Sequence, residues 1–136
     1  MEFLLDTNVV SNFFKRQPAV MVHFGRVTPA QLAISAVTVM EIEYGFERQP
    51  AARGRFSAVW AAFQADVTVL PYGSRDAVAT AGVRAHLAAK GQPIGPFDLQ
   101  LAGTALAHGL TLVTHNTGEF ARVPGLKLQD WWQEGS

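Results

Sequence analysis

Four short apolar runs, separated by longer segments of helical character, constrain the fold of this chain more than any other feature. The runs are Glu2–Leu5, Gln31–Ile34, Val67–Leu70 and Thr111–Thr114, and a weaker fifth run, Leu126–Leu128, follows a Pro-Gly turn. The helical segments are Asn8–Lys15, Pro18–Val27, Val37–Glu47, Ala51–Ala65, Ser74–Lys90 and Phe97–His108. Strands that alternate with helices pair in parallel through right-handed crossovers. The sequence therefore predicts an α/β fold, a three-layer α/β/α sandwich with a four- to five-stranded parallel sheet.

The length and composition indicate one well-packed domain over residues 1–136. Of these residues 49% are hydrophobic and only 16% are charged, a balance that excludes disorder. The chain has no cysteine, which excludes disulfides and thiolate metal sites and favours a reducing compartment. The first residues lack the basic and long apolar regions of a signal peptide, and no run is long enough to cross a membrane. We therefore expect a cytoplasmic protein.

The formal net charge of zero argues against a strongly basic nucleic-acid-binding protein. The distribution of charge changes this interpretation if Asp6, Glu41 and Asp98 share one metal site. Eleven basic residues would then remain against eight acids, and the rest of the surface would carry a charge of +3. Such a surface is compatible with a polyanionic substrate but does not require one.

Asp6 directly follows the first apolar run, and ligands of parallel sheets bind at the carboxyl ends of the strands. This position favours a functional carboxylate. The string Asp6-Thr7-Asn8 is also a good start for a helix, in which Asp6 would cap the N-terminus. Both interpretations stay open for Asp6 when it is considered alone.

Glu41 is predicted to lie on the apolar face of a helix, because helical spacing aligns it with Val37, Tyr44 and Gly45. Glu43 is rotated by about 200° from Glu41 and is expected to reach solvent. A carboxylate on an apolar face costs free energy unless a cation pairs with it. The alternative is that the apolar face ends just short of Glu41 and leaves this residue solvated.

Asp98 follows Pro96, a residue favoured at helix starts, and an acid in the first helical turn suits the helix dipole. Asp98 also shares a predicted inward face with Leu101, Ala102 and Ala105. The position is therefore explained equally well by a structural role and by a functional role.

Three acids on apolar faces or strand ends are more informative together than singly. At about 5 Å and an effective dielectric of about 20, each ionised pair repels by roughly 3 kcal/mol. A domain with about 5–15 kcal/mol of total stability needs a counter-ion to keep such a cluster. A site made only of carboxylate oxygens suits Mg²⁺, with Mn²⁺ as the alternative.

Several strings along the whole chain resemble the PIN domain, and within it the VapC toxins of bacterial toxin–antitoxin pairs. They are Leu4–Asn8, Ser35–Thr38 with Glu41–Gly45, Gly91–Gly95 with Asp98, Leu112–Thr117 with Phe120, Val123–Leu126, and Asp130-Trp131. The resemblance implies a Mg²⁺-dependent endoribonuclease that cleaves single-stranded regions of RNA and inhibits translation and growth. It also implies a cognate VapB-like antitoxin as inhibitor, and contact with operator DNA only through that antitoxin.

The resemblance places Asp6, Glu41 and Asp98 in the acidic site of the family. Asp6 and Asp98 are expected to bind the metal directly, and Glu41 is expected to complete the shell through water or to accept a proton. Many family members carry a fourth acid after the last core strand, where this chain has Asn116, with Glu119 three residues on. The number of metal ions therefore stays open. Polar neighbours expected to support the catalytic groups are Thr7, Asn8, Thr114, Asn116 and Glu119.

The replacement of the fourth acid by Asn116 leaves an alternative from another class, a catalytically silent PIN-like module that binds RNA or protein. Two rival enzymes fail on visible residues. A phosphotransferase of the haloacid dehalogenase type needs an acid at position 8, where this chain has asparagine. A response-regulator receiver domain needs an acid after the third strand, which ends in Leu70-Pro71-Tyr72.

The segment Ser11–Val27 carries more apolar side chains than one core-facing stripe needs: Phe13, Phe14, Val20, Met21, Val22 and Phe24. We therefore predict a homodimer, and an antitoxin that lies across the same helices. His115 is the only histidine expected near the acids, and its contact with substrate is a further alternative. Arg48, Arg53 and Arg55 either contact RNA phosphates or form a solvated surface.

Overall fold

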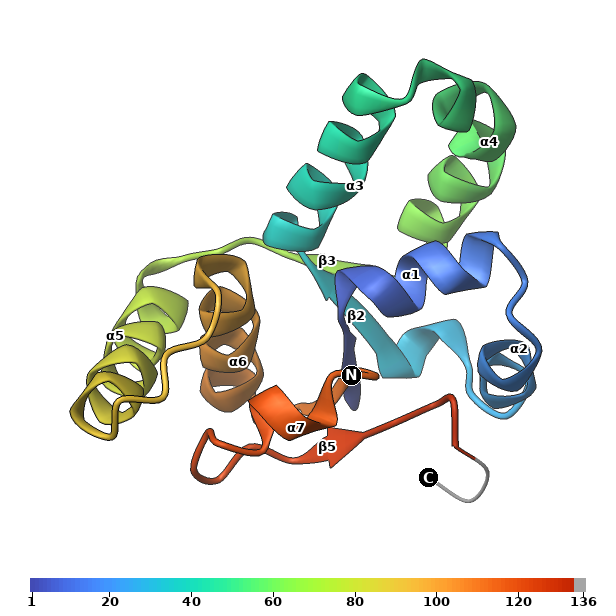
Figure 1. Ribbon diagram of the computed structural model, residues 1–136. Coiled ribbons are helices and arrows are strands. Elements are labelled where there is room, and N and C mark those ends of the chain that lie inside the picture. The colour runs from blue at the N-terminus through green and yellow to red at the C-terminus, as the bar shows by residue number, and fades with distance from the viewer. Residues whose placement is uncertain (134–136) are drawn as a thin grey trace.

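The computed structural model describes residues 1–133, which form a parallel sheet between two layers of helices (Figure 1). Within these residues the sheet has five strands: β1 (Phe3–Leu5), β2 (Leu32–Ser35), β3 (Thr68–Leu70), β4 (Thr111–Val113) and β5 (Leu128–Gln129). Their spatial order is β3-β2-β1-β4-β5, and every neighbouring pair is parallel. The predicted α/β fold with a parallel sheet is therefore confirmed.

The helices lie close to their predicted positions. They are α1 (Thr7–Phe14), α2 (Pro18–Phe24), α3 (Ala36–Arg48), α4 (Pro50–Asp66), α5 (Ser74–Ala89), α6 (Pro96–His108) and the short α7 (Thr117–Phe120), with a 3-10 turn at Pro29–Gln31. The short α7 and the 3-10 turn were not predicted, because segments of three or four residues show no helical periodicity. Among the described residues, no helix has both the length and the apolar character needed to span a membrane.

Alternate side chains of the buried strands build two hydrophobic cores. Leu4 of β1 packs with residues of α5, α6 and α7, whereas Phe3 and Leu5 pack with residues of α1, α2 and α4. This alternation is the period of two expected of a strand. The residues of β1 and β2 are buried on both faces, which explains why these two strands read as continuous apolar runs.

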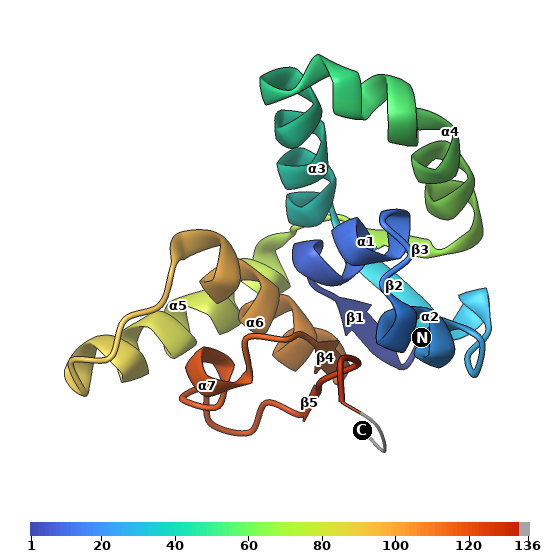
Figure 2. The ribbon, with the colours of Figure 1, turned by 45° about the vertical axis from the view of Figure 1, so that its right-hand side comes forward.

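The helices α3 and α4 form a hairpin that projects beyond the sheet (Figure 1). Figure 2 shows α1 below this hairpin and the α5–α6 pair to its lower left, where α6 contacts α3. The buried residues of α3 are Val37, Thr38, Ile42 and Phe46. Tyr44 is 59% exposed, so the prediction that it shares an inward face with Glu41 is wrong.

The apolar side chains of α1 and α2 are mostly covered within the chain. Phe13 packs against Phe24 and Phe63, and Phe14 packs against Phe56 and Trp60 of α4. Of the six residues that suggested a dimer interface, only Val22 is largely exposed, at 53%. Helix α4 therefore covers most of the apolar surface of this segment, a contact that the sequence did not reveal.

Candidate active site

The predicted acids come together at the carboxyl edge of the sheet, where β1, β2 and β4 end. Asp6 follows β1 directly and its backbone N–H donates to Val113 of the neighbouring β4 at 3.1 Å. Glu41 lies on α3, which begins immediately after β2, and Asp98 lies in the first turn of α6. Parallel strands place their carboxyl ends at one edge, which is where such folds bind ligands.

Asp6 is both the cap of α1 and a buried acid of the site. Its Oδ1 accepts a hydrogen bond from the N–H of Val9 at 2.8 Å, so the capping interpretation is correct. The side chain is almost completely buried. Burial raises the pKa of Asp6 above its ordinary value, hydrogen bonds from Thr114 and Val9 oppose this rise, and the nearby charge of Glu41 adds to it. A cation at this edge would therefore stabilise the ionised form of the Asp6 carboxyl group.

Within residues 1–133, α6 has no side-chain cap, and the backbone N–H nearest its start is taken by an acid other than Asp98. The backbone N–H of Gly95, which precedes α6, donates to Glu119 Oε1 at 3.3 Å. Partial burial raises the pKa of Asp98 to about 6, and the charge of Glu119 is the next largest cause. The charges of Asp6 and Glu41 raise the pKa of Asp98 further, so the three predicted acids act on one another.

Glu41 is half-buried at the rim of the site and is oriented by a threonine. The hydroxyl of Thr7 donates to Glu41 Oε1 at 2.7 Å, and the same oxygen of Thr7 lies 3.2 Å from the hydroxyl of Thr38. The residue that directly follows Asp6 therefore fixes the position of Glu41. Asn8, the next residue, is exposed, and its backbone carbonyl accepts a hydrogen bond from the side-chain amide of Asn12.

Glu43 reaches solvent as expected, with 42% of its side chain exposed, but it also has partners on the next helix. Its carboxylate accepts hydrogen bonds from Trp60 at 2.7 Å and from Arg53 at 3.1 Å, both on α4. These bonds lower the pKa of Glu43, with the Trp60 bond as the largest cause. Glu43 therefore holds the α3–α4 hairpin together, a role that helical spacing alone does not reveal.

Glu119 brings a fourth negative charge to the site, and Asn116 holds it. Asn116 precedes α7, and its side-chain amide donates to Glu119 Oε2. The backbone N–H of Asn116 donates to the hydroxyl of Thr114 at 3.0 Å, and that threonine also bonds to Asp6. Of Asn116 and Glu119, the latter therefore carries a negative charge, and this charge raises the pKa of Asp98.

The acids fit a hydrated divalent cation. In the part of the chain that the structure describes, the arginine ion pairs involve Glu43 and Glu47 rather than the four acids of the site. Within residues 1–133, no three His, Cys, Asp or Glu side chains are close enough to hold a metal ion directly. Mg²⁺ commonly binds through only one or two carboxylates and keeps several waters. Asp6 and Asp98 are suited to that number, and Glu41, bonded to Thr7, to a contact through water.

The other predicted residues lie away from the acids or have other partners. Arg53 pairs with Glu43 and Glu47, Arg48 covers the ring of Tyr44, and Arg55 covers the ring of Phe56. His108 contacts the buried Asp76 at 3.1 Å. His115 follows Thr114 at the edge of the site and contacts Asp130.

A parallel sheet with acids at its carboxyl edge is typical of metal-dependent nucleases, and comparison with known sequences gives the family. Residues 3–126 match the family model of the PIN domain. The chain is 40% identical to the tRNA(fMet)-specific endonuclease VapC of Shigella flexneri and 38% identical to the protein of that name from Salmonella typhimurium. Each alignment covers 96% of this chain and 98% of the relative. The chain therefore belongs to the PIN domain family, as a member of its VapC ribonucleases.

Solved structures agree with this assignment. The DNA-bound VapBC of Salmonella typhimurium has a chain that is 39% identical, with a TM-score of 0.87 over 96% of this chain and 98% of that chain. A chain of VapBC2 from Rickettsia felis, bound to a promoter DNA fragment, is 27% identical with a TM-score of 0.85 over 96% and 99%. Both of these structures are thus VapBC complexes bound to DNA.

Proposed function

We propose that this protein is a Mg²⁺-dependent endoribonuclease that cleaves single-stranded regions of RNA and acts as the toxin of a toxin–antitoxin pair. The observation that carries the proposal is the gathering of Asp6, Glu41, Asp98 and Glu119 at the carboxyl edge. Partial burial, and then the charges of Glu119, Asp6 and Glu41, raise the pKa of Asp98 there to about 6. Four mutually repelling acids are unfavourable in a domain of this size unless a cation offsets their charge.

Each acid has a distinct part in the proposed reaction. Asp6 and Asp98 hold the cation, with Mn²⁺ as a possible substitute. When bound, the cation offsets negative charge on the phosphate and makes water easier to deprotonate. Glu41, fixed by Thr7, accepts a proton from the attacking water. Asn116 keeps Glu119 turned toward Asp98 and Gly95.

The proposed substrate is tRNA(fMet), acted on in the cytoplasm. The support is the name of the relatives from Shigella flexneri and Salmonella typhimurium, to which this chain is 40% and 38% identical over nearly its whole length. A tRNA offers single-stranded loops whose bases are free to contact protein. Cleavage of an initiator tRNA removes a component that translation requires, which accounts for inhibition of growth.

The proposed inhibitor is a VapB-like antitoxin that lies between α1 and the α3–α4 hairpin. A cavity of about 180 Å³ there is lined by apolar residues such as Phe14 and Phe46 and extends to Thr7 and Glu41. A second cavity of about 340 Å³ shares Phe14 and Lys15 and is lined by Arg16 and Arg55. This groove suits a segment with a basic side chain near the acids and acidic side chains at its other end. Contact with operator DNA then occurs through the antitoxin.

The experiment that tests the proposed function is cleavage of purified tRNAs. Wild type should cleave initiator tRNA in Mg²⁺, should be inactive in EDTA, and should cleave elongator tRNAs more slowly. Asp98→Asn should be inactive under every condition. A wild type that binds RNA but cleaves none in Mg²⁺ or Mn²⁺ would establish the silent module instead.

A further inference from the structure

His115 lies between two residues that are bonded to acids of the site. Thr114, on one side, bonds to Asp6, and Asn116, on the other, donates to Glu119. Consecutive Cα atoms are about 3.8 Å apart, so the backbone of His115 is fixed at the edge of the acidic cluster. The proposed mechanism gives His115 no part. Its side chain is 59% exposed, whereas that of His108, which also contacts an acid, is 25% exposed.

The imidazole of His115 is held on two sides. Its Nδ1 lies 3.1 and 3.2 Å from the two carboxylate oxygens of Asp130, which is almost completely buried. The carboxylate is itself fixed by the N–H of Trp132 at 2.9 Å. One face of the imidazole stacks on the ring of Trp132, with centroids 4.8 Å apart and an interplanar angle of 30°. A surface side chain is thus immobilised in one orientation.

The remaining surface of this ring is available. The side chain of His115 is 59% exposed although Nδ1 and one face are in use. His23 offers a contrast, because it is buried and its ring stacks on Trp131 at an interplanar angle of 6°. His115 therefore presents a fixed aromatic plane and the Nε2 edge to solvent beside the site.

We propose that His115, backed by Trp132, is a stacking platform for one nucleobase next to the phosphodiester that is cleaved; this inference rests on the proposed function. Proteins bind the unstacked bases of single-stranded RNA on aromatic side chains, histidine included. A base is a better partner for this ring than a phosphate, because the negative Asp130 carboxylate offsets any positive charge on the imidazole. Stacking also suits a ring whose plane is already fixed.

The first test separates substrate binding from the chemical step with initiator tRNA in Mg²⁺. His115→Ala removes the plane and should raise KM by about 10-fold or more, as alanine substitution at stacking sites does, with kcat nearly unchanged. His115→Phe keeps the plane and should stay within about threefold of the wild-type KM. His115→Asn keeps a polar group without an aromatic ring and should resemble His115→Ala. Equal melting temperatures of the variants confirm that the fold is intact.

The second test identifies the base. The tRNA is prepared with an abasic nucleotide immediately before or immediately after the cleavage position. One of the two should weaken cleavage by wild type through KM, yet should add little to the defect of His115→Ala, because the same contact is already lost. Independent, multiplicative defects for both abasic substrates would overturn the platform.

Three further outcomes would also overturn it. These are a KM for His115→Ala equal to that of wild type, a phenylalanine variant as defective as the alanine variant, and a loss confined to kcat. Any of them, with wild type active, leaves the proposed function standing. Absence of cleavage by wild type would instead refute the proposed function and the platform with it.

Discussion

At the scale of single residues, the acids of the site differ in what else they do. Asp6 caps α1 through Val9, and Glu119 accepts the N–H of Gly95 before α6. Asp98 contributes its charge to the cluster while Glu119 occupies the nearby backbone N–H. A substitution at Asp98 therefore separates function from folding more cleanly than one at Asp6.

We expect Asp98→Asn to be inactive and yet, without metal at neutral pH, to melt no lower than wild type. The substitution removes a negative charge that partial burial and the charges of Glu119, Asp6 and Glu41 disfavour, and asparagine is tolerated in a first helical turn. Thermal unfolding in EDTA measures this. Added Mg²⁺ should raise the melting temperature of wild type more than that of the variant, because a ligand stabilises the form that binds it. Equal Mg²⁺ effects would contradict the assignment of Asp98 as a ligand.

The same difference should depend on pH. The folded pKa of Asp98 is about 6, above its ordinary 3.8, so ionisation of Asp98 disfavours the folded state. The penalty is absent below pH about 4, grows between about 4 and 6, and is complete above about 6. Without metal, the melting temperature of Asp98→Asn minus that of wild type should therefore increase across this window. A constant difference from pH 4 to 7 would exclude the proposed repulsion.

Glu41 and Glu43 lie two residues apart on α3 and should respond differently to the same change. Glu41→Gln removes a charge beside Asp6 and should abolish most cleavage with RNA binding retained. Glu43→Gln should remain active but lose up to about 1 kcal/mol of stability, because it weakens a partly exposed pair with Arg53. Single-turnover cleavage and urea unfolding distinguish them. If both substitutions slowed cleavage equally, the assignment of Glu41, and not Glu43, to the site would be wrong.

At the scale of elements, the contact between α5 and α6 depends on one glycine. A Cβ built at Gly103 would lie 2.0 Å from Thr80 Oγ1 and 2.8 Å from Thr80 Cα, so a side chain would push the helices apart. We expect Gly103→Ala to destabilise the protein by about 1–3 kcal/mol or more. Gly82→Ala on α5, where nothing lies within 4 Å, is the matched control and should stabilise by about 0.5–1 kcal/mol. Denaturant unfolding of both variants checks the pair.

Elements and acids were predicted from the sequence to different extents. The strands and long helices follow from apolar runs, and the edge that collects Asp6, Glu41 and Asp98 follows from parallel pairing. Side-chain partners did not follow, because they join elements that are distant in the chain. Glu43 reaches Trp60 from another helix, and Tyr44, predicted to face inward, is exposed because α3 projects beyond the sheet.

Strand β5 and helix α3 show why some predicted boundaries were more accurate than others. The fifth strand was predicted at Leu126–Leu128 and lies at Leu128–Gln129, because pairing with Leu112 and Val113 of β4 fixes its register. Helix α3 instead begins where predicted within one residue, since Ser35 caps it locally through the N–H of Val37. A boundary set by a local cap was therefore predicted more accurately than one set by pairing with a distant strand.

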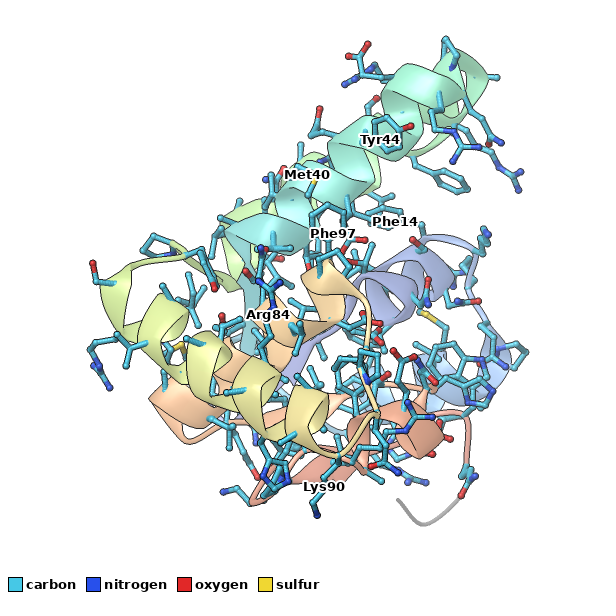
Figure 3. All side chains as sticks on the ribbon, turned by 60° about the vertical axis from the view of Figure 1, so that its left-hand side comes forward. Phe14, Met40, Tyr44, Arg84, Lys90 and Phe97 are labelled. Carbon is cyan, nitrogen blue, oxygen red and sulfur yellow. The ribbon has the colours of Figure 1, made fainter. Side chains whose placement is uncertain are left out.

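At the scale of the whole molecule, we propose a face for self-association from its exposed apolar side chains. Met40 and Tyr44 lie one turn apart on α3, and Phe97 begins α6, which contacts α3 (Figure 3). We expect a homodimer through this face rather than through α1 and α2. Tyr44→Arg should give a monomer in light scattering, whereas Val78→Arg on the exposed side of α5 should not. A monomeric wild type would show the expectation of a dimer to be wrong.

The double use of Asp6 bears on how such a protein decays once selection for cleavage ends. Loss of its carboxylate removes the cap of α1 as well as a charge of the site, and cap removal alone costs about 0.5–2 kcal/mol. A lineage that keeps the domain for binding is therefore expected to retain a capping residue here, either aspartate or a residue that caps as well, such as asparagine or serine, long after turnover has disappeared. Asp98 has no such protection. In descendants of this chain, a capping residue after β1 indicates an intact helix, whereas the combination of aspartates at positions 6 and 98 indicates that the acidic site is retained.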